Sequence, residues 1–193
     1  MTRRTLLTCL AIVVPTLALA IVGVTHPTTL NDASALYWRD LHIGILAVFP
    51  LLGFIPWLIV RGRNAVVSWV AGVLGFLYAA FYTGLDVLAG IGAGGLQHAG
   101  MDMAKGTVYE LGDQLGLVGS IFLLAGVLVA GGFTIVTSGL RAIPGTIIIA
   151  IGAMLFLTRH IFFPLGVLGQ VCLAVGGVLL VLARVRAERL AVR

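Results

Sequence analysis

The chain has 193 residues, of which 60% are hydrophobic and only 10% are charged, and its formal net charge is +5. Soluble domains carry about a quarter charged residues, so this composition excludes a water-soluble protein. It also excludes a disordered chain, because disorder requires low hydrophobicity and high charge.

Six apolar runs follow one another along the chain, and each is close to the roughly 20 residues that a transmembrane helix needs. They are residues 6–24, 41–60, 66–91, 115–137, 143–158 and 161–183. Residues 1–193 are therefore expected to form one domain. The predicted fold class is all-α, a polytopic membrane protein with a single bundle of six transmembrane helices.

The first run has a second interpretation. Arg3, Arg4, the apolar stretch and the sequence Ala18-Leu19-Ala20 together have the features of a secretory signal peptide with its cleavage site. The apolar character continues through Val24, which is longer than the usual core of a signal peptide. We therefore expect this run to be retained as a membrane span.

Two later runs contain local signals of their own. Pro50 and Pro56 predict a bend in the second span, because proline lacks a backbone donor and crowds the preceding turn. Arg159 and His160 interrupt the apolar stretch of 41 residues from position 143 to position 183. A charged pair is far less costly at a turn than in mid-bilayer. This favours two spans joined by a tight turn, with a re-entrant pair as the alternative.

The distribution of basic residues predicts the orientation of the chain. With both termini in the cytoplasm, nine of the twelve Lys and Arg residues lie inside, and only Arg39, Lys105 and Arg159 lie outside. This is the asymmetry that the positive-inside rule requires. We expect a multi-pass protein of a bacterial plasma membrane. Its basic residues would face lipid headgroups rather than nucleic acid.

This orientation places most ionisable side chains other than arginine on the outer side. All four histidines and six of the seven acids fall there: His26, His42, His98, His160, Asp32, Asp40, Asp86, Asp102, Glu110 and Asp113. Histidine titrates near neutral pH, and its neutral ring binds metal ions. The outer ends of the spans are therefore where we expect a functional site.

The first outer loop is bracketed by His26 on one side and by Arg39, Asp40 and His42 on the other. In one interpretation, Asp40 caps a helix and His42 lies at the membrane interface. In the other, His26 and His42 converge on a metal ion, a haem edge or a proton path.

Asp86 lies within an apolar run, four and eight residues after Tyr82 and Tyr78, so the three share one helix face. An acid in a membrane span normally faces the bundle interior. We expect Tyr82 to donate to it and Arg39 or Arg159 to neutralise it. Asp86 is either part of a structural ion pair or a carboxylate that binds a substrate or transfers protons.

A glycine-rich stretch follows, at positions 90, 92, 94 and 95, and predicts that the helix ends there and leads into a flexible outer loop over residues 92–113. In this loop His98, Met101 and Met103 offer an imidazole and two thioethers, which suit copper(I). The alternative is that the two methionines only seat the loop on the membrane.

Three polar residues begin the fourth span: Glu110, Asp113 and Gln114 share one helix face. They either complement the helix dipole or flank a site. Cys9 and Cys172 lie inside apolar runs and indicate buried thiols rather than a disulfide or a thiolate metal site.

The leading functional hypothesis is an outward-facing polar pocket that binds a small ligand, an ion or a partner subunit. Its expected lining residues are His26, Arg39, Asp40, His42, Tyr82, Asp86, Arg159 and His160. The sequence lacks the common nucleotide-binding, hydrolase and zinc-protease motifs, and whether the protein is an enzyme stays open.

Two alternatives remain at this point. One is a membrane oxidoreductase or metal protein that holds copper, zinc or haem through the outer histidines. The other is a small transporter or proton-coupled channel. The expected partners are the lipid bilayer and either a second copy of the chain or another membrane subunit, for which the Gly112 and Gly116 pattern on the fourth span is suited.

Overall fold

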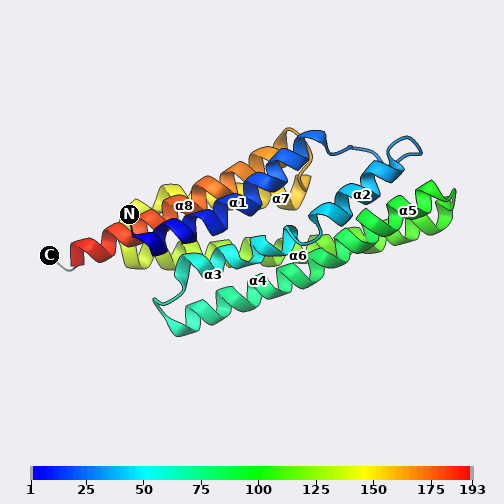
Figure 1. Ribbon diagram of the computed structural model, residues 1–193. Helices are drawn as coiled ribbons and strands as arrows, with labels where there is room; N and C mark the ends of the chain where they lie inside the picture. Colours follow the sequence, from blue (N-terminus) through cyan, green and yellow to red (C-terminus); the bar gives the residue numbers. More distant parts are fainter. Residues whose placement is uncertain (1, 192–193) are drawn as a thin grey trace.

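The computed structural model describes residues 2–191, which form long helices with no β-strand among them (Figure 1). The elements are α1 (Arg3–Thr25), α2 (Ala35–Ile45), η1 (Phe49–Gly53), α3 (Phe54–Val60), α4 (Ala65–Leu85), η2 (Asp86–Gly92), α5 (Ala93–His98), α6 (Asp102–Ser138), η3 (Gly139–Ala142), α7 (Ile143–Arg159) and α8 (Leu165–Ala191). The all-helical fold class is thereby confirmed.

Several of these helices are long and apolar enough to cross a membrane. Within residues 2–191 they are Arg3–Thr25, Ala65–His98, Asp102–Arg159 and Leu165–Leu190, and the bent pair of α2 with η1–α3 adds a fifth if it is one span. Large apolar side chains such as Trp69, Phe76 and Val136 are at least 69% exposed, as expected of surfaces that face lipid.

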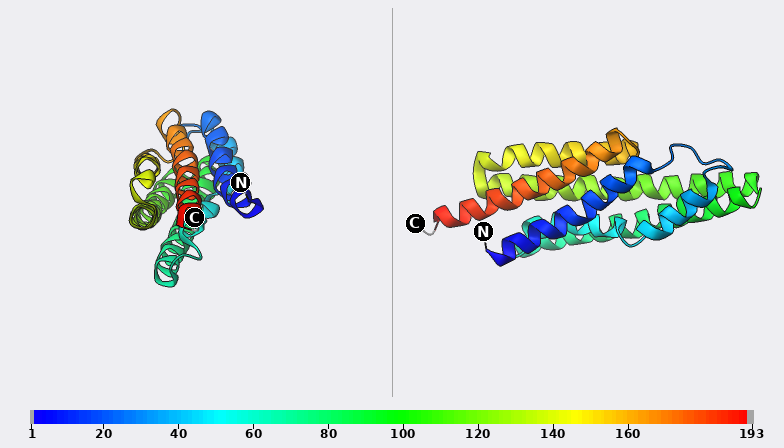
Figure 2. Two further views of the ribbon diagram at one scale, coloured as in Figure 1. Left: turned by 90° about the vertical axis from the view of Figure 1, so that its left-hand side faces the viewer. Right: turned by 45° about the horizontal axis from the view of Figure 1, so that its top comes forward.

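The segment Asp102–Arg159 consists of two helices that run in opposite directions. α6 passes along the whole bundle, the chain reverses at η3, and α7 returns beside α6 before α8 runs back again (Figure 2). α8 packs between α1 and α7, and α4 packs along α6. Both ends of the chain consequently lie at the same end of the bundle (Figure 2).

The predicted bend in the second apolar run is confirmed. α2 ends at Ile45, and the following helical segment, which begins at Phe49, is tilted from it by 46°. Pro50 occupies the first turn of η1, where its missing N–H costs nothing and its ring prevents a straight continuation of α2.

The predicted helix end in the glycine-rich stretch is wrong. α4, η2 and α5 form a continuous helical segment through His98, and most of the expected flexible loop is helix. Two of the glycines instead permit close packing against α2. A Cβ on Gly90 would lie 2.4 Å from the His42 ring, and one on Gly94 would lie 3.0 Å from the backbone of Arg39.

Candidate metal centre

Three histidines from distant parts of the sequence meet near the ends of α1 and α7 that lie away from the chain termini, and α5 and the start of α6 extend beyond this level (Figure 1). His26 follows α1, His42 lies in α2, and His160 follows α7. One ring nitrogen of each lies within 4.8 Å of the other two, and no other group of three His, Cys, Asp or Glu residues in the described chain is arranged in this way. His26 and His42 are buried and His160 is partly buried.

Backbone hydrogen bonds orient two of these rings. The Nδ1 atom of His26 lies 2.7 Å from the carbonyl oxygen of Pro27, and Nδ1 of His42 lies 2.7 Å from that of Trp38. A carbonyl oxygen only accepts, so Nδ1 is the donor in both rings and Nε2 of each neutral ring retains a lone pair. Proteins commonly orient metal-binding histidines in this way.

His160 is held by a side chain rather than by a carbonyl. Its Nδ1 atom hydrogen-bonds with the hydroxyl of Tyr82, whose ring is stacked against it at an interplanar angle of 16°. His160 also adopts a backbone φ of 49°, which is rare for a residue with a side chain and costs about 1–3 kcal/mol. Such strain is typical of positions that a functional site requires.

The histidines are favoured in their neutral form. Burial lowers the pKa of His26 below its ordinary value of 6.5, although the hydrogen bond to Pro27 opposes this effect. Burial and, to a smaller extent, repulsion from His26 and His42 lower the pKa of His160 well below 6.5. Neutral imidazole is the form that binds metal ions.

A buried carboxylate adjoins the histidines. Asp86, the first residue of η2, has no exposed surface, and its Oδ1 atom lies 4.0 Å from Nε2 of His42. Neither carboxylate oxygen has a hydrogen-bond partner within residues 2–191. An ionised carboxylate in this position is costly unless a positive charge compensates it. Asp86 therefore offers two unpartnered oxygens beside His42, and a cation would satisfy them in their ionised form.

The partners that the sequence predicted for Asp86 are wrong. The hydroxyl of Tyr82 bonds with His160 instead. Arg39 donates to Asp40 at 2.8 Å, and the two side chains are 35% and 60% exposed. The cause is the place of each residue on α2, since Arg39 packs beside Gly94 of α5 and pairs with the exposed Asp40, whereas His42 is buried beside Asp86.

Aromatic side chains enclose the histidines. The ring of His26 lies 4.9 Å from both Trp38 and Phe162, measured between centroids, and Phe49 stacks on His160 at 5.3 Å. Trp38 also donates through Nε1 to the carbonyl of Ala89 at 3.0 Å, which ties α2 to η2. Apolar surroundings of this kind limit the access of water to a metal site and strengthen its electrostatic interactions.

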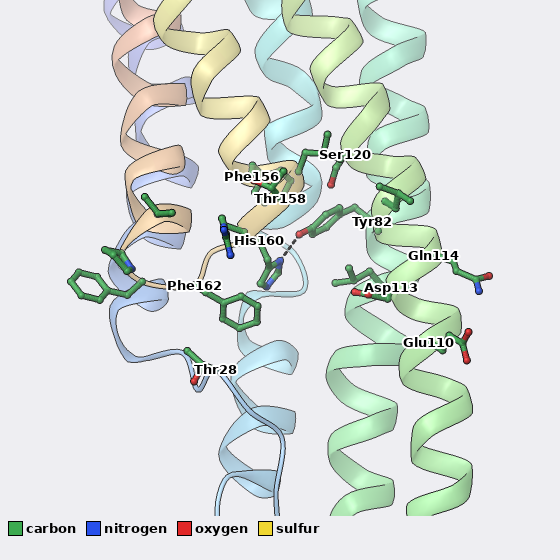
Figure 3. Close-up of a pocket in the computed structure, with 18 residues that line it drawn as sticks. Thr28, Tyr82, Glu110, Asp113, Gln114, Ser120, Phe156, Thr158, His160 and Phe162 are labelled. Carbon is green, nitrogen blue, oxygen red and sulfur yellow. Dashed lines mark hydrogen bonds between the residues drawn. The ribbon is translucent and has the colours of Figure 1, made fainter.

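A cavity of about 670 Å³ opens next to His160 and Tyr82. Figure 3 shows Tyr82 reaching toward His160 from the side of α4 and α6, and Asp113 and Glu110 on α6. The other polar lining residues are Thr28, Gln114, Ser120, Thr158 and the exposed Arg159. The cavity gives the partly buried His160 a connection with the surroundings of the bundle.

The other predicted copper ligands lie elsewhere. His98 ends α5, and Met101 and Met103 lie at the turn into α6. All three side chains are exposed, Met103 to 92%. The helices do not bring these three side chains into a buried site or into the cluster of His26, His42 and His160. Copper binding by them stays a prediction.

Three contributors to the site had no signal in the sequence. In the sequence, Trp38 indicates only an aromatic residue at the membrane interface, and Phe162 is part of an apolar run. Gly90 resembled a helix terminator, whereas its lack of a side chain makes room for His42. A pattern of glycine facing histidine becomes visible only when the helices that carry them are placed side by side.

Comparisons of the chain with protein-family models, with curated proteins and with solved structures give no match. The chemistry of the histidine cluster is therefore the basis for assigning a function.

Proposed function

We propose that this chain is a multi-pass membrane protein that binds one divalent transition-metal ion through His26, His42 and His160, with Asp86 supplying negative charge beside it. The observation that supports this most directly is the pair of backbone hydrogen bonds from Nδ1, which leave the Nε2 lone pairs of His26 and His42 free for a ligand. A metal ion would then be what the outward-facing polar pocket expected from the sequence binds.

The ligand set favours zinc or copper(II). Imidazole nitrogens suit both ions, and three histidines with an open fourth position form a familiar zinc site. Haem is disfavoured, because a haem ring would separate ligands bound on its opposite faces, whereas these three nitrogens lie within 4.8 Å of one another. In a tetrahedral zinc site the nitrogens would be about 3.3 Å apart, so the cluster would contract slightly around the ion.

Asp86 balances the charge of such a site. Three neutral imidazoles leave the full double charge of the ion uncompensated in apolar surroundings, which is unfavourable. The unpartnered carboxylate beside His42 reduces that charge, either as a direct ligand or across a short distance. The cavity beside His160 would supply the ion and any molecule that occupies the remaining coordination position.

The position of the site in the membrane follows from the proposed topology. Counting the bent α2–α3 pair as one span and α6 and α7 as two gives six crossings and both termini on one side. The excess of arginines at the terminal end supports a cytoplasmic location for it. The histidines then lie near the non-cytoplasmic surface.

Metal titration of the purified, metal-free protein tests the proposal. We expect one zinc or copper(II) ion per chain, and an affinity at least about 100-fold weaker in each of H26A, H42A and H160A. H98A provides the control, because His98 is exposed and lies outside the cluster. If wild type binds neither ion, or if H98A weakens binding as much as the three other variants, the proposal is wrong.

Tyr82 offers a second and finer variant. Y82F removes only the hydroxyl that holds His160, and we expect metal affinity to fall about 10- to 100-fold. Y78F is the matched control, since the hydroxyl of Tyr78 donates to the Phe49 carbonyl at 3.1 Å. The two variants lose comparable hydrogen bonds from the same helix, so a difference in affinity separates positioning of His160 from general destabilisation.

A further inference from the structure

A second polar pocket lies at the opposite end of the bundle, where the chain begins and ends. It has a volume of about 540 Å³ and is formed by the start of α1, the turn after α3 and the last turns of α8. Its charged lining residues are Arg4, Arg61, Arg63, Arg184, Arg189 and Glu188. Five arginines thus face a single acid.

Arg184 is the buried member of this group. Its exposed fraction is 8%, and its Nη1 atom donates to the carbonyl of Ile59 at 2.8 Å. Its Nε atom is buried and has no hydrogen-bond partner within the described chain, and the nearest acid, Glu188, is 3.8 Å away. Burying a guanidinium that is only partly paired is unfavourable, so the pocket contains an unsatisfied donor and an unsatisfied charge.

The remaining contacts do not remove the excess charge. Glu188 already accepts from Arg63 at 3.0 Å. Arg61 donates to the neutral hydroxyl of Thr8 and lies over the Trp57 ring at 5.0 Å from its centroid. The positive charges therefore repel one another across a shared cavity. A compact anion with several acceptor oxygens would relieve this repulsion.

Membrane orientation alone does not require such a pocket. Arg3, Arg141 and Arg186 are exposed and are not among the lining residues, as expected of arginines that only mark the cytoplasmic interface. The other five converge from three segments of the chain, and one of them is buried.

We propose that this pocket binds a phosphate group, carried either by an anionic phospholipid or by a free phosphate compound. Planar guanidinium groups match phosphate oxygens in geometry as well as charge, and basic pockets between helices at the cytoplasmic surface suit phosphorylated headgroups. This site shares no residue with the histidine cluster, so the two proposals can fail independently.

Thermal unfolding in lipid nanodiscs distinguishes the two sources of phosphate. In phosphatidylcholine nanodiscs, the first arm compares sodium phosphate with sodium chloride at equal ionic strength. The second arm replaces part of the lipid by phosphatidylglycerol. We expect an increase in the unfolding midpoint of about 5 °C in at least one arm. An increase in the first arm identifies free phosphate, and an increase confined to the second identifies a lipid headgroup.

Variants tie that increase to the pocket. R61A/R189A and R184Q should lose most of it, whereas R141A/R186A, which removes the same charge as R61A/R189A from exposed positions, should keep it. Because Arg184 also bonds to Ile59, R184Q can fail to fold, and R61A/R189A then decides the question. No increase in either arm, or equal losses in R61A/R189A and R141A/R186A, would overturn the proposal.

Discussion

Asp86 shows what a single residue contributes to the candidate metal centre. Its carboxylate is buried and has no hydrogen-bond partner within residues 2–191, so in its ionised form it destabilises the metal-free fold. The same carboxylate stabilises the site when a cation is present. Its contribution to stability should therefore change sign with metal occupancy.

Replacing Asp86 by asparagine tests this change of sign. We expect D86N to raise the unfolding midpoint of the metal-free protein by about 3 °C or more and to weaken metal binding about 10-fold. D40N removes the same charge from an exposed side chain and should do neither. A metal-free D86N that unfolds earlier than wild type would mean that Asp86 has a stabilising partner without the ion.

At the scale of the elements, the site depends on how closely α2 approaches the continuous helix formed by α4, η2 and α5. η2 is a π-helical turn, a feature that often occurs at functional sites because it shifts the helix face. It begins at Asp86 and contains Gly90, whose missing side chain accommodates the His42 ring. Gly112 of α6 approaches the backbone of Ala89 from another side in the same manner.

An alanine at position 90 should therefore displace His42. A Cβ there would lie 2.4 Å from the ring, so we expect G90A to lower the free energy of unfolding by about 1–3 kcal/mol and to abolish metal binding. Chemical denaturation and metal titration measure the two effects.

Gly95 offers the control on the same helical segment. A Cβ at Gly95 meets nothing within 4 Å, so G95A should raise the free energy of unfolding by about 0.5–1 kcal/mol and leave metal binding intact. Equal behaviour of G90A and G95A would show that helix propensity, and not the space for His42, governs this position.

At the scale of the whole molecule, the proposed six crossings separate two chemically different ends. The histidine cluster and Asp86 lie near the ends of α1 and α7, and the arginine pocket lies at the opposite ends of these helices, near both termini. The proposed orientation predicts which end faces the cytoplasm.

Cysteine labelling in intact cells measures this orientation. In a background without Cys9 and Cys172, we expect M103C to react with a membrane-impermeant maleimide in intact cells. L140C should react with the same reagent only after the cells are permeabilised. Both positions are well exposed, 92% and 80%, so access to the reagent and not burial decides the result. Labelling of L140C in intact cells would contradict the orientation.

The sequence predicted the parts of the structure that depend on local pattern. Long apolar runs predicted helices, Pro50 predicted the bend, and His26 and His42 were recognised as a pair across one loop. His160 was predicted only as one more lining residue of the same pocket. Its close approach to His26 and His42 depends on the packing of helices, because it lies 118 positions after His42 in the chain. The roles of Gly90 and of the π-helical turn depend on the same packing.

The origin of the three histidines has a consequence for biogenesis. They come from the ends of the first and the penultimate long helices and from α2, so the cluster is complete only after nearly the whole polypeptide has been inserted and assembled. A nascent chain that stops before α7 contains only two of the three histidines of the cluster and cannot form the complete site. Only fully assembled molecules would therefore bind the metal ion. When metal is scarce, the assembled metal-free protein would lack the stabilisation that binding provides and would be more susceptible to quality-control proteolysis.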